Sequence, residues 1–131
     1  MDNIINISNV TFEYTDNDNV SSVLDNLSLT IEKGSFTVIL GHNGSGKSTF
    51  AKLITGLLKP DFGKITVDGI STDDEDKEIE VHRRVGMVFQ NPDNQIVATI
   101  VEEDVAFGPE NLGLPPSEIR RRVDESLKAV N

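Results

Sequence analysis

The chain has 131 residues, a formal net charge of −10 and no cysteine. This length fits one domain, and 37% hydrophobic with 26% charged residues indicates a soluble, globular protein. The lack of cysteine excludes disulfides and cysteine metal sites, and the acidic balance argues against a general binder of nucleic acid or anionic membranes. Residues 1–6 lack the basic start and apolar core of a signal peptide, and no apolar run approaches membrane-spanning length.

The first part of the chain predicts two antiparallel strands. Residues 5–14 alternate apolar and polar side chains, apart from a slip near Asn9, which indicates a half-buried strand. Residues 15–19 form a polar turn, and residues 23–31 alternate again before a second turn at residues 32–34.

A glycine-rich loop follows these strands. Residues 35–40 are a short apolar run that predicts a buried strand, and residues 50–58 have helical spacing. Between them the chain matches the phosphate-binding pattern G-x-x-x-x-G-K-[ST] at every fixed position from Gly41 to Ser48. This strand–loop–helix context is what the motif requires, and it disfavours the alternative of a glycine-rich turn with an incidental lysine.

The residue types of this loop suit a triphosphate, which needs many donors within a small radius. Glycines at 41, 44 and 46 let the backbone bring its N–H groups close to phosphate oxygens. The helix that follows presents its free N-terminal N–H groups and positive dipole end to the same anion. In this motif Lys47 reaches the β- and γ-phosphates and the Ser48 hydroxyl ligates Mg²⁺. The predicted phosphate-binding residues are Gly41, Asn43, Gly44, Ser45, Gly46, Lys47, Ser48 and Thr49.

The middle of the chain predicts two further strands separated by an acidic run. Residues 61–63 break the helix, and residues 64–69 form a strand that ends in a turn. Residues 73–80 are acidic; a solvated loop is favoured over a metal site because the carboxylates lack a converging spacing. Residues 85–89 then predict a short apolar strand that ends at Gln90.

Gln90 follows a strand end, where polar side chains of α/β folds can point into a ligand crevice. It could therefore hold Mg²⁺ or a water molecule, although a polar turn at residues 90–95 is the alternative. His82 shows no partner in the sequence and is predicted to lie on the surface.

The last part of the chain predicts two helices. Thr99 and Glu102 form a capping-box pattern that opens a short helix, and Gly108-Pro109 is predicted to stop it. From Ser117 onward apolar residues recur every three or four positions, which predicts an amphipathic helix. Arg120-Arg121-Arg122 lie largely on its polar side, where a solvated face is favoured over contact with an acidic partner.

Four features resemble the first half of an ABC-type ATP-binding subunit, and more narrowly the ATPase subunits of energy-coupling factor importers of the cobalt and vitamin type. They are residues 10–14, 41–49, 85–90 and 91–97, the last of which continues into residues 101–112. The phosphate loop alone fits many families, whereas the loop with Gln90 and this continuation fits few. The resemblance covers essentially all 131 residues.

This resemblance implies an α/β fold: part of a P-loop NTPase core, an amino-terminal antiparallel β subdomain and the start of a helical subdomain. Residues 1–34 and 61–70 would form the antiparallel β part, and residues 35–60 and 81–90 the P-loop core part. Residues 91–131 would contain the Q-loop and the start of the helical subdomain.

The resemblance also implies roles for individual residues, with ATP and Mg²⁺ as cofactors. Tyr14 would stack on adenine, although a plain strand-surface role is the alternative. Lys47 and Gln90 would be catalytic, with Gln90 at the metal and the attacking water. Ser48 and Gln90 would be the metal ligands. His42 occupies a variable loop position and receives no catalytic role.

The implied setting is a transporter at the cytoplasmic face of the membrane. The partners would be a second ATP-binding subunit, identical or paralogous, in a head-to-tail dimer, and an integral membrane component. ATP binding and hydrolysis would drive import of a vitamin or a transition-metal ion. The family pattern continues with a signature loop, an apolar strand ending in Asp-Glu and a switch histidine, none of which occurs in these 131 residues. We therefore expect an amino-terminal half with weak or absent hydrolysis of its own.

Two other functions stay open at this point. The chain could be a non-hydrolysing module that senses ATP, because it has the phosphate loop but lacks the catalytic carboxylate. It could also belong to a soluble ABC ATPase without a membrane partner. The acidic balance and residues 91–97 count against this last interpretation.

Overall fold

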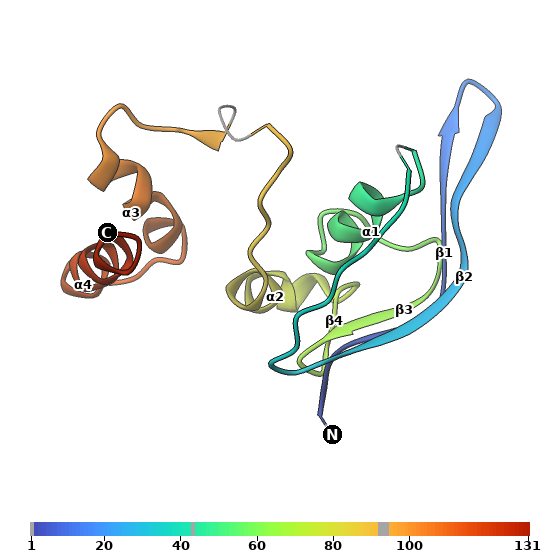
Figure 1. The fold of residues 1–131 in the computed structure, drawn as a ribbon, viewed down its shortest axis with the longest axis horizontal. Helices are drawn as coiled ribbons and strands as arrows, with labels where there is room; N and C mark the ends of the chain where they lie inside the picture. The colour runs from blue at the N-terminus through green and yellow to red at the C-terminus, as the bar shows by residue number, and fades with distance from the viewer. Residues whose placement is uncertain (1, 43, 92–94) are drawn as a thin grey trace. The chain divides into compact units, whose positions relative to one another are not determined.

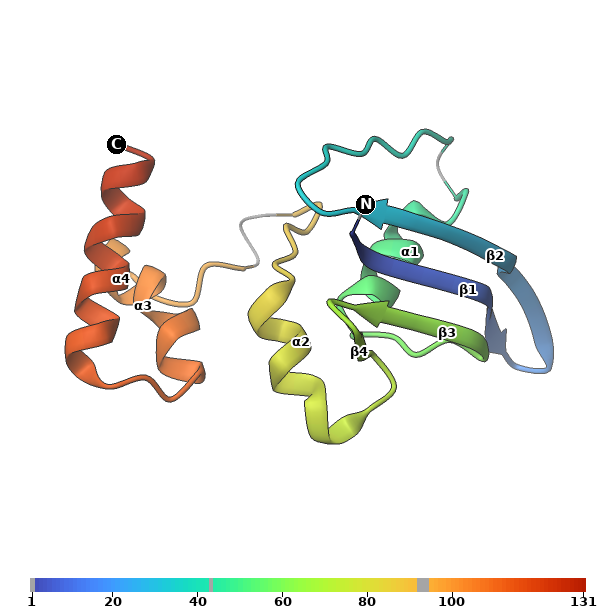
Figure 2. The same ribbon diagram turned by 90° about the horizontal axis from the view of Figure 1, so that it is seen from below.

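The computed structural model describes residues 2–42, 44–91 and 95–131, in two compact units, Met1–Met87 and Val88–Asn131. The first unit contains a four-stranded antiparallel sheet in the order β2-β1-β3-β4 (Figure 1, Figure 2). Its strands are β1 (Asn3–Asp16), β2 (Asn19–Glu32), β3 (Phe62–Val67) and β4 (Ile70–Ser71). Its helices are α1 (Lys47–Ile54) and α2 (Glu78–Arg84), the second preceded by the 3-10 turn η1 (Glu75–Lys77). The predicted partial α/β fold with an antiparallel β part is confirmed.

The core of this unit lies between α1 and one face of the sheet (Figure 2). Leu53 of α1 and Ile65 of β3 are each only 1% exposed. The apolar positions of β1 that face the helix are those predicted from its alternation. The buried core residues are Ile7, Val10, Phe12, Phe50, Leu53, Ile54, Ile65 and Val67.

The slip in the alternation of β1 is a β-bulge. Asn9 has a left-handed φ of 50°, and the pairing with β2 shifts register between Ile7 and Val10. The pairing with β3 shifts between Ser8 and Thr11. An extra residue in one strand bends that strand and increases its twist. The end of the β1–β2 hairpin therefore turns away from the direction of its first half (Figure 1).

Two strands predicted from apolar runs do not form. Residues 35–40 and 85–89 have no strand pairing, and Leu40 and Val88 are 89% and 88% exposed. A strand needs a neighbour that satisfies its backbone N–H and C=O groups. Among the described residues the sheet contains only β1 to β4, none of which pairs with these runs. An apolar run alone was therefore not sufficient for a strand.

The helix predicted over residues 50–58 is real but displaced toward the loop. It begins at Lys47 and ends at Ile54, before the expected break at residues 61–63. Gly56 adopts a left-handed φ of 80° and its N–H donates to the carbonyl of Leu53. A glycine in this conformation is a common helix terminator, which explains the early end.

The acidic run does not remain a loop throughout. Its first residues are exposed, and Asp74 accepts a hydrogen bond from the backbone N–H of Asp76. From Glu78 the chain forms α2, which the sequence analysis missed, because this helix buries only one side chain, Val81. His82 on the same helix is exposed, as predicted.

The second unit contains α3 (Val101–Asn111) and α4 (Pro116–Ala129). Ala106 and Val123 are its buried apolar residues. The prediction that Gly108-Pro109 stops α3 is wrong, since Pro109 lies inside the helix. A proline removes one N–H donor, but the N–H of Leu112 still donates to the carbonyl of Gly108 at 3.2 Å.

The predicted capping box at Thr99 and Glu102 is also wrong. The N-cap residue is Ile100, and no side chain caps the helix. Instead Asp104 accepts hydrogen bonds through Oδ1 from the backbone N–H groups of Val97 and Ala98, at 2.8 and 3.2 Å. The segment before α3 is thus attached to the first turn of the helix by a carboxylate that the capping pattern did not identify.

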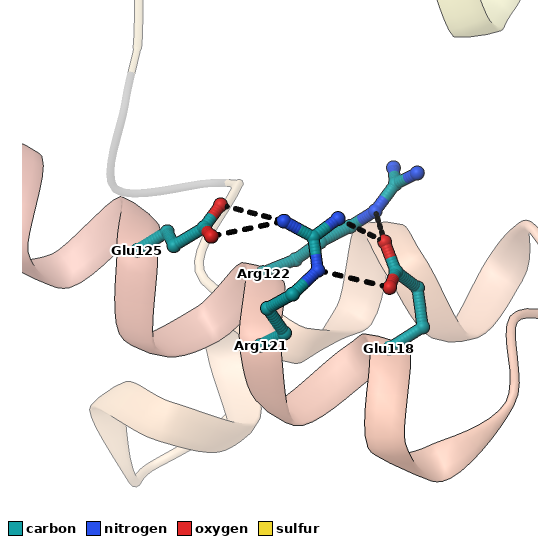
Figure 3. Close-up of polar contacts among 4 residues, drawn as sticks. All are labelled: Glu118, Arg121, Arg122 and Glu125. Atoms are coloured by element: carbon teal, nitrogen blue, oxygen red, sulfur yellow. Dashed lines mark hydrogen bonds and ion pairs between the residues drawn. The ribbon is translucent and has the colours of Figure 1, made fainter.

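The amphipathic helix predicted from Ser117 is α4, and its arginines pair with carboxylates of the same unit (Figure 3). Arg121 bridges Glu118 and Glu125, and Arg122 donates to Glu118 at 3.0 Å. Arg120 pairs with Asp124 and also with Glu102 of α3, at 2.9 Å. The three arginines are about half exposed, so each pair contributes little alone.

None of the helices in the described part of the chain combines the length and apolar character needed to cross a bilayer.

Replacing Gly63 with alanine should destabilise the first unit. Gly63 has a φ of 86°, and an added Cβ would lie 2.2 Å from the carbonyl oxygen of Asn9. The left-handed backbone alone costs about 1–2 kcal/mol, and the overlap adds to it. Gly69→Ala is the control, because Gly69 has a φ of 78° with no atom within 4 Å of an added Cβ. The free energies of unfolding from urea titrations test this; equal losses for the two variants would contradict it.

Glu118→Gln should weaken the second unit at neutral pH but not in strong acid. Hydrogen bonds from Arg121 and then Arg122 lower the pKa of Glu118 from 4.5 to about 2. A carboxylate with a depressed pKa stabilises the fold fully above its unfolded pKa, and this contribution is lost as the pH falls through the folded value.

Urea unfolding midpoints of the wild type and Glu118→Gln, measured from neutral pH down to about pH 2, test this expectation. The difference should be constant well above 4.5, shrink as the pH falls below that value and become small as the pH passes through about 2. Glu110→Gln, on α3 and outside this ion-pair cluster, is the matched control. A difference that persists unchanged at the acid end would refute the assignment.

Candidate functional site

The phosphate loop leads directly into the N-terminus of α1. Gly46 is the N-cap residue with a φ of 97°, and Gly44 has a φ of 85°. The helical ladder begins with the N–H of Phe50, which donates to the carbonyl of Gly46 at 2.9 Å. The preceding N–H groups of the first turn therefore have no acceptor within the helix. The first turn contains no acidic residue, so it offers donors and a positive dipole end to an anion.

Gly46 is required here for two reasons. Its left-handed φ is unfavourable for other residues. An added Cβ would also lie 2.9 Å from Cγ1 of Val23 on β2. The loop therefore approaches the hairpin at a point where only glycine fits.

Lys47 lies back over the loop. Its ammonium group donates to the backbone carbonyls of Gly41 and His42, the latter at 3.0 Å. The N–H of Ser45 also donates to the carbonyl of His42, at 3.1 Å. These bonds curl the loop around the lysine, so its cationic group is held where a phosphate would compete with the carbonyls. Asn43, another predicted phosphate ligand, lies outside the described residues.

Ser48 and Thr49 occupy the first turn of α1 with different surroundings. Ser48 is exposed, so its hydroxyl is accessible to a metal ion beside a bound phosphate. No group of three or more His, Cys, Asp or Glu side chains that could hold a metal occurs within the described ranges. Thr49 is only 7% exposed and faces the hairpin.

Tyr14, from the far half of β1, meets the phosphate-loop helix. Its hydroxyl shares a hydrogen bond of 3.1 Å with Oγ1 of Thr49, a residue 35 positions away in the sequence. Its ring forms an edge-to-face pair with that of Phe12, with ring centroids 4.9 Å apart and planes at 86°. Phe12 is buried in the core with Phe50, whereas Tyr14 is 43% exposed. A partly exposed aromatic ring is thus held beside the first turn of α1, whereas stacking of Tyr14 on adenine stays a prediction.

An apolar cavity of about 200 Å³ opens beside the loop, and the sequence analysis did not foresee it. One wall is formed by leucines of β2, and the other walls come from the unpaired apolar run 35–40, the phosphate loop and α1. The lining residues are Leu24, Leu27, Leu29, Ile39, Leu40, Ser45, Gly46, Lys47 and Phe50. The alternation of β2 places Leu27 and Leu29 on one face, which is the signal that could have revealed it. Leu24 is out of phase with them and joins this face because the register shifts between Leu27 and Leu24.

Gln90 belongs to the second unit and is exposed. After it, the side-chain amide of Gln95 donates to the backbone carbonyl of Asn91 at 3.4 Å. Residues 92–94, part of the predicted Q-loop segment, lie outside the described residues. The structure brings together Tyr14, Thr49 and the loop up to Lys47, whereas a role for Gln90 at the phosphates stays a prediction.

Comparison with known proteins identifies the family. The chain matches the family described as ABC transporter over residues 24–131. It is 56% identical over 130 residues to the energy-coupling factor transporter ATP-binding protein EcfA1 of Clostridioides difficile (strain 630), covering 99% of this chain and 47% of the relative. EcfA1 of Clostridium perfringens (strain 13 / Type A) is 57% identical over 131 residues, covering 98% of this chain and 47% of the relative.

Solved structures of similar fold support the same family assignment. The cbiO1 protein of Clostridium perfringens, described as part of the ABC transporter complex cbiONQ, matches with a TM-score of 0.81 and 38% identity, over 98% of this chain and 50% of that chain. The ATP-binding cassette MJ0796, in a dimeric post-hydrolysis state bound to ADP and Pi, matches with a TM-score of 0.80 and 33% identity, over 95% and 56%.

The chain spans about half the length of the curated relatives that it matches. The resemblance to energy-coupling factor ATP-binding subunits that the motifs indicated is confirmed by these identities. The chain has a phosphate loop at the start of α1 and an aromatic residue beside it. Because the family match also covers most of its residues, the chain belongs to the ABC transporter family.

Proposed function

We propose that this chain binds ATP with Mg²⁺ at residues 41–49 and forms part of the ATP-binding subunit of a membrane importer. The observation that carries the proposal is the hydrogen bond between Tyr14 and Thr49, which holds a partly exposed aromatic ring beside the first turn of α1. A nucleotide has an anionic end and a flat aromatic end, and this arrangement offers a partner to each.

In this proposal each residue has a defined task. The loop N–H groups and Lys47 bind the phosphates, with Lys47 exchanging its loop carbonyls for phosphate oxygens. Ser48 supplies one oxygen ligand to Mg²⁺, and Tyr14 stacks on adenine. Gln90 senses the γ-phosphate at the metal and the attacking water. ATP supplies the phosphoanhydride bond, and the chain binds and orients it.

The descriptions of the relatives support the partners that we propose. Curated relatives are named as energy-coupling factor transporter ATP-binding proteins, cbiO1 is described as part of a transporter complex, and MJ0796 is dimeric. We infer a second ATP-binding subunit in a head-to-tail dimer and an integral membrane component, at the cytoplasmic face of the membrane. The cargo would be a vitamin or a transition-metal ion, selected by the membrane component.

Hydrolysis requires more than this site. The 131 residues contain no apolar strand that ends in Asp-Glu, from which the Mg²⁺-supporting aspartate and the glutamate that acts on water would come. Phosphoryl transfer depends on all of these positioning and charge-stabilising groups. We therefore propose that ATP turnover is a property of the intact subunit, and that these residues alone turn over ATP weakly or not at all.

Lys47→Ala should abolish MgATP turnover by the intact subunit, with a loss of at least about 100-fold, because a charge-stabilising group is removed from the transferred phosphate. Lys52→Ala removes the same charge from the last turn of α1 and is the matched control. Steady-state phosphate release measures the effect. Turnover that survives Lys47→Ala would refute the assignment of this loop.

Tyr14→Ala should weaken MgATP binding by about 1–3 kcal/mol, the usual contribution of base stacking on an aromatic ring. Tyr14→Phe keeps the ring and loses only the hydrogen bond to Thr49. It should therefore stay much closer to the wild type. Calorimetric dissociation constants for MgATP separate the two. If both variants lose the same affinity, the hydroxyl and not the ring carries the effect, and stacking is excluded.

A further inference from the structure

The β1–β2 hairpin contains two left-handed residues that face the same irregular stretch of pairing. Asn9 on β1 and Asn26 on β2 have φ values of 50° and 48°. The register between the strands shifts between Ile7 and Val10 and again between Val10 and Phe12. We call Asn9 and Asn26 the bulge pair.

Each member of the bulge pair is tied to a hydroxyl of the opposite strand. The N–H of Asn9 donates to Oγ of Ser28 at 2.9 Å, and this hydroxyl donates back to Oδ1 of Asn9 at 3.3 Å. The N–H of Asn26 donates to Oγ1 of Thr11 at 3.0 Å. A bulge leaves backbone groups outside the regular ladder. Two hydroxyls thus replace the missing ladder bonds and hold the bend in one geometry.

The other edge of β1 is held at the same place. Gly63 of β3 lies so close to Asn9 that no side chain fits between them. Beyond the bend, Asp61 replaces β3 as the neighbour of β1. Its N–H donates to the carbonyl of Thr11 at 2.9 Å, and its Oδ2 accepts from the N–H of Glu13 at 2.8 Å.

The bend sets the direction of the far half of the β1–β2 hairpin. Past it, β1 turns toward α1 (Figure 1), so that Phe12 enters the core and Tyr14 reaches Thr49. A strand that continued straight in the ladder with β3 would take Tyr14 in another direction, because the bulge is what redirects it. The position of the Tyr14 ring therefore depends on the bend as well as on the ring's own contacts.

We propose that Thr11 and Ser28 are positioning residues for the nucleotide base: their hydroxyls lock the bulge pair and so set the place of the Tyr14 ring beside the phosphate loop. This inference rests on the proposed function, in which Tyr14 stacks on adenine. The hydroxyls of Thr11 and Ser28 bond to Asn26 and Asn9, so in this proposal they act through the direction of β1.

The test is a double-mutant cycle in the intact ATP-binding subunit, read as the dissociation constant for MgATP. Thr11→Val and Ser28→Ala each remove one hydroxyl, and each should weaken binding by about threefold or more, a part of the stacking contribution. In a Tyr14→Ala background the same changes should have no further effect. Thr11→Ser, which keeps the hydroxyl, should bind like the wild type.

Thr30→Val is the matched control, since Thr30 is exposed on β2, pairs with Asn6 and lies on the far side of the bend from Tyr14. It should leave the dissociation constant unchanged. Two separate variants keep the test decisive if one of them fails to fold, which circular dichroism would reveal.

The outcomes separate this inference from the proposed function. If Tyr14→Ala leaves MgATP affinity unchanged, stacking is wrong and the positioning role falls with it, whereas the assignment of the phosphate loop is tested separately by Lys47→Ala. If Tyr14→Ala weakens binding but Thr11→Val and Ser28→Ala do not, only the positioning role is overturned. Equal losses with and without Tyr14 would also overturn it, because the hydroxyls would then act through general stability and not through the ring.

Discussion

The packing of α1 against the antiparallel sheet is the contact on which the rest of the first unit depends. α1 has eight residues, and isolated helices shorter than about 12–15 residues are marginal in water. It persists because Phe50, Leu53 and Ile54 are buried against β1 and β3. The same packing points the N-terminus of the helix at the phosphate loop, so the apolar core and the anion site are two consequences of one interface.

The two units are stabilised in different ways. The first relies on a continuous apolar core, with several side chains almost fully buried. Among its described residues, the second buries only Ala106 and Val123, and it surrounds α4 with ion pairs between half-exposed side chains. Exposed ion pairs contribute little individually and are screened by salt. The contribution of these ion pairs to the helical unit therefore falls as salt is added.

The errors of the sequence-based predictions share a physical cause. Residues 35–40 and 85–89 are apolar enough for strands, but strand formation depends on a neighbour elsewhere in the chain, and none of β1 to β4 pairs with them. The capping box at Thr99 did not form either: no side chain caps α3, and Asp104 accepts from the backbone N–H groups of Val97 and Ala98 before the helix. Local sequence patterns identify segments that could form a strand or a helix cap, whereas the partners available in the folded chain decide whether they do.

The sequence by itself determined the phosphate loop, the two long strands before it and the family, because these depend on glycine conformation, a lysine at fixed spacing and period-two alternation, all of which are local. The break in the alternation near Asn9 was also visible in the sequence. Only the tertiary structure decided that this slip is a bend, that the bend is held by hydroxyls of Thr11 and Ser28, and that Tyr14 meets Thr49. Those contacts join residues far apart in the chain, and no local pattern specifies which distant partner a side chain will reach.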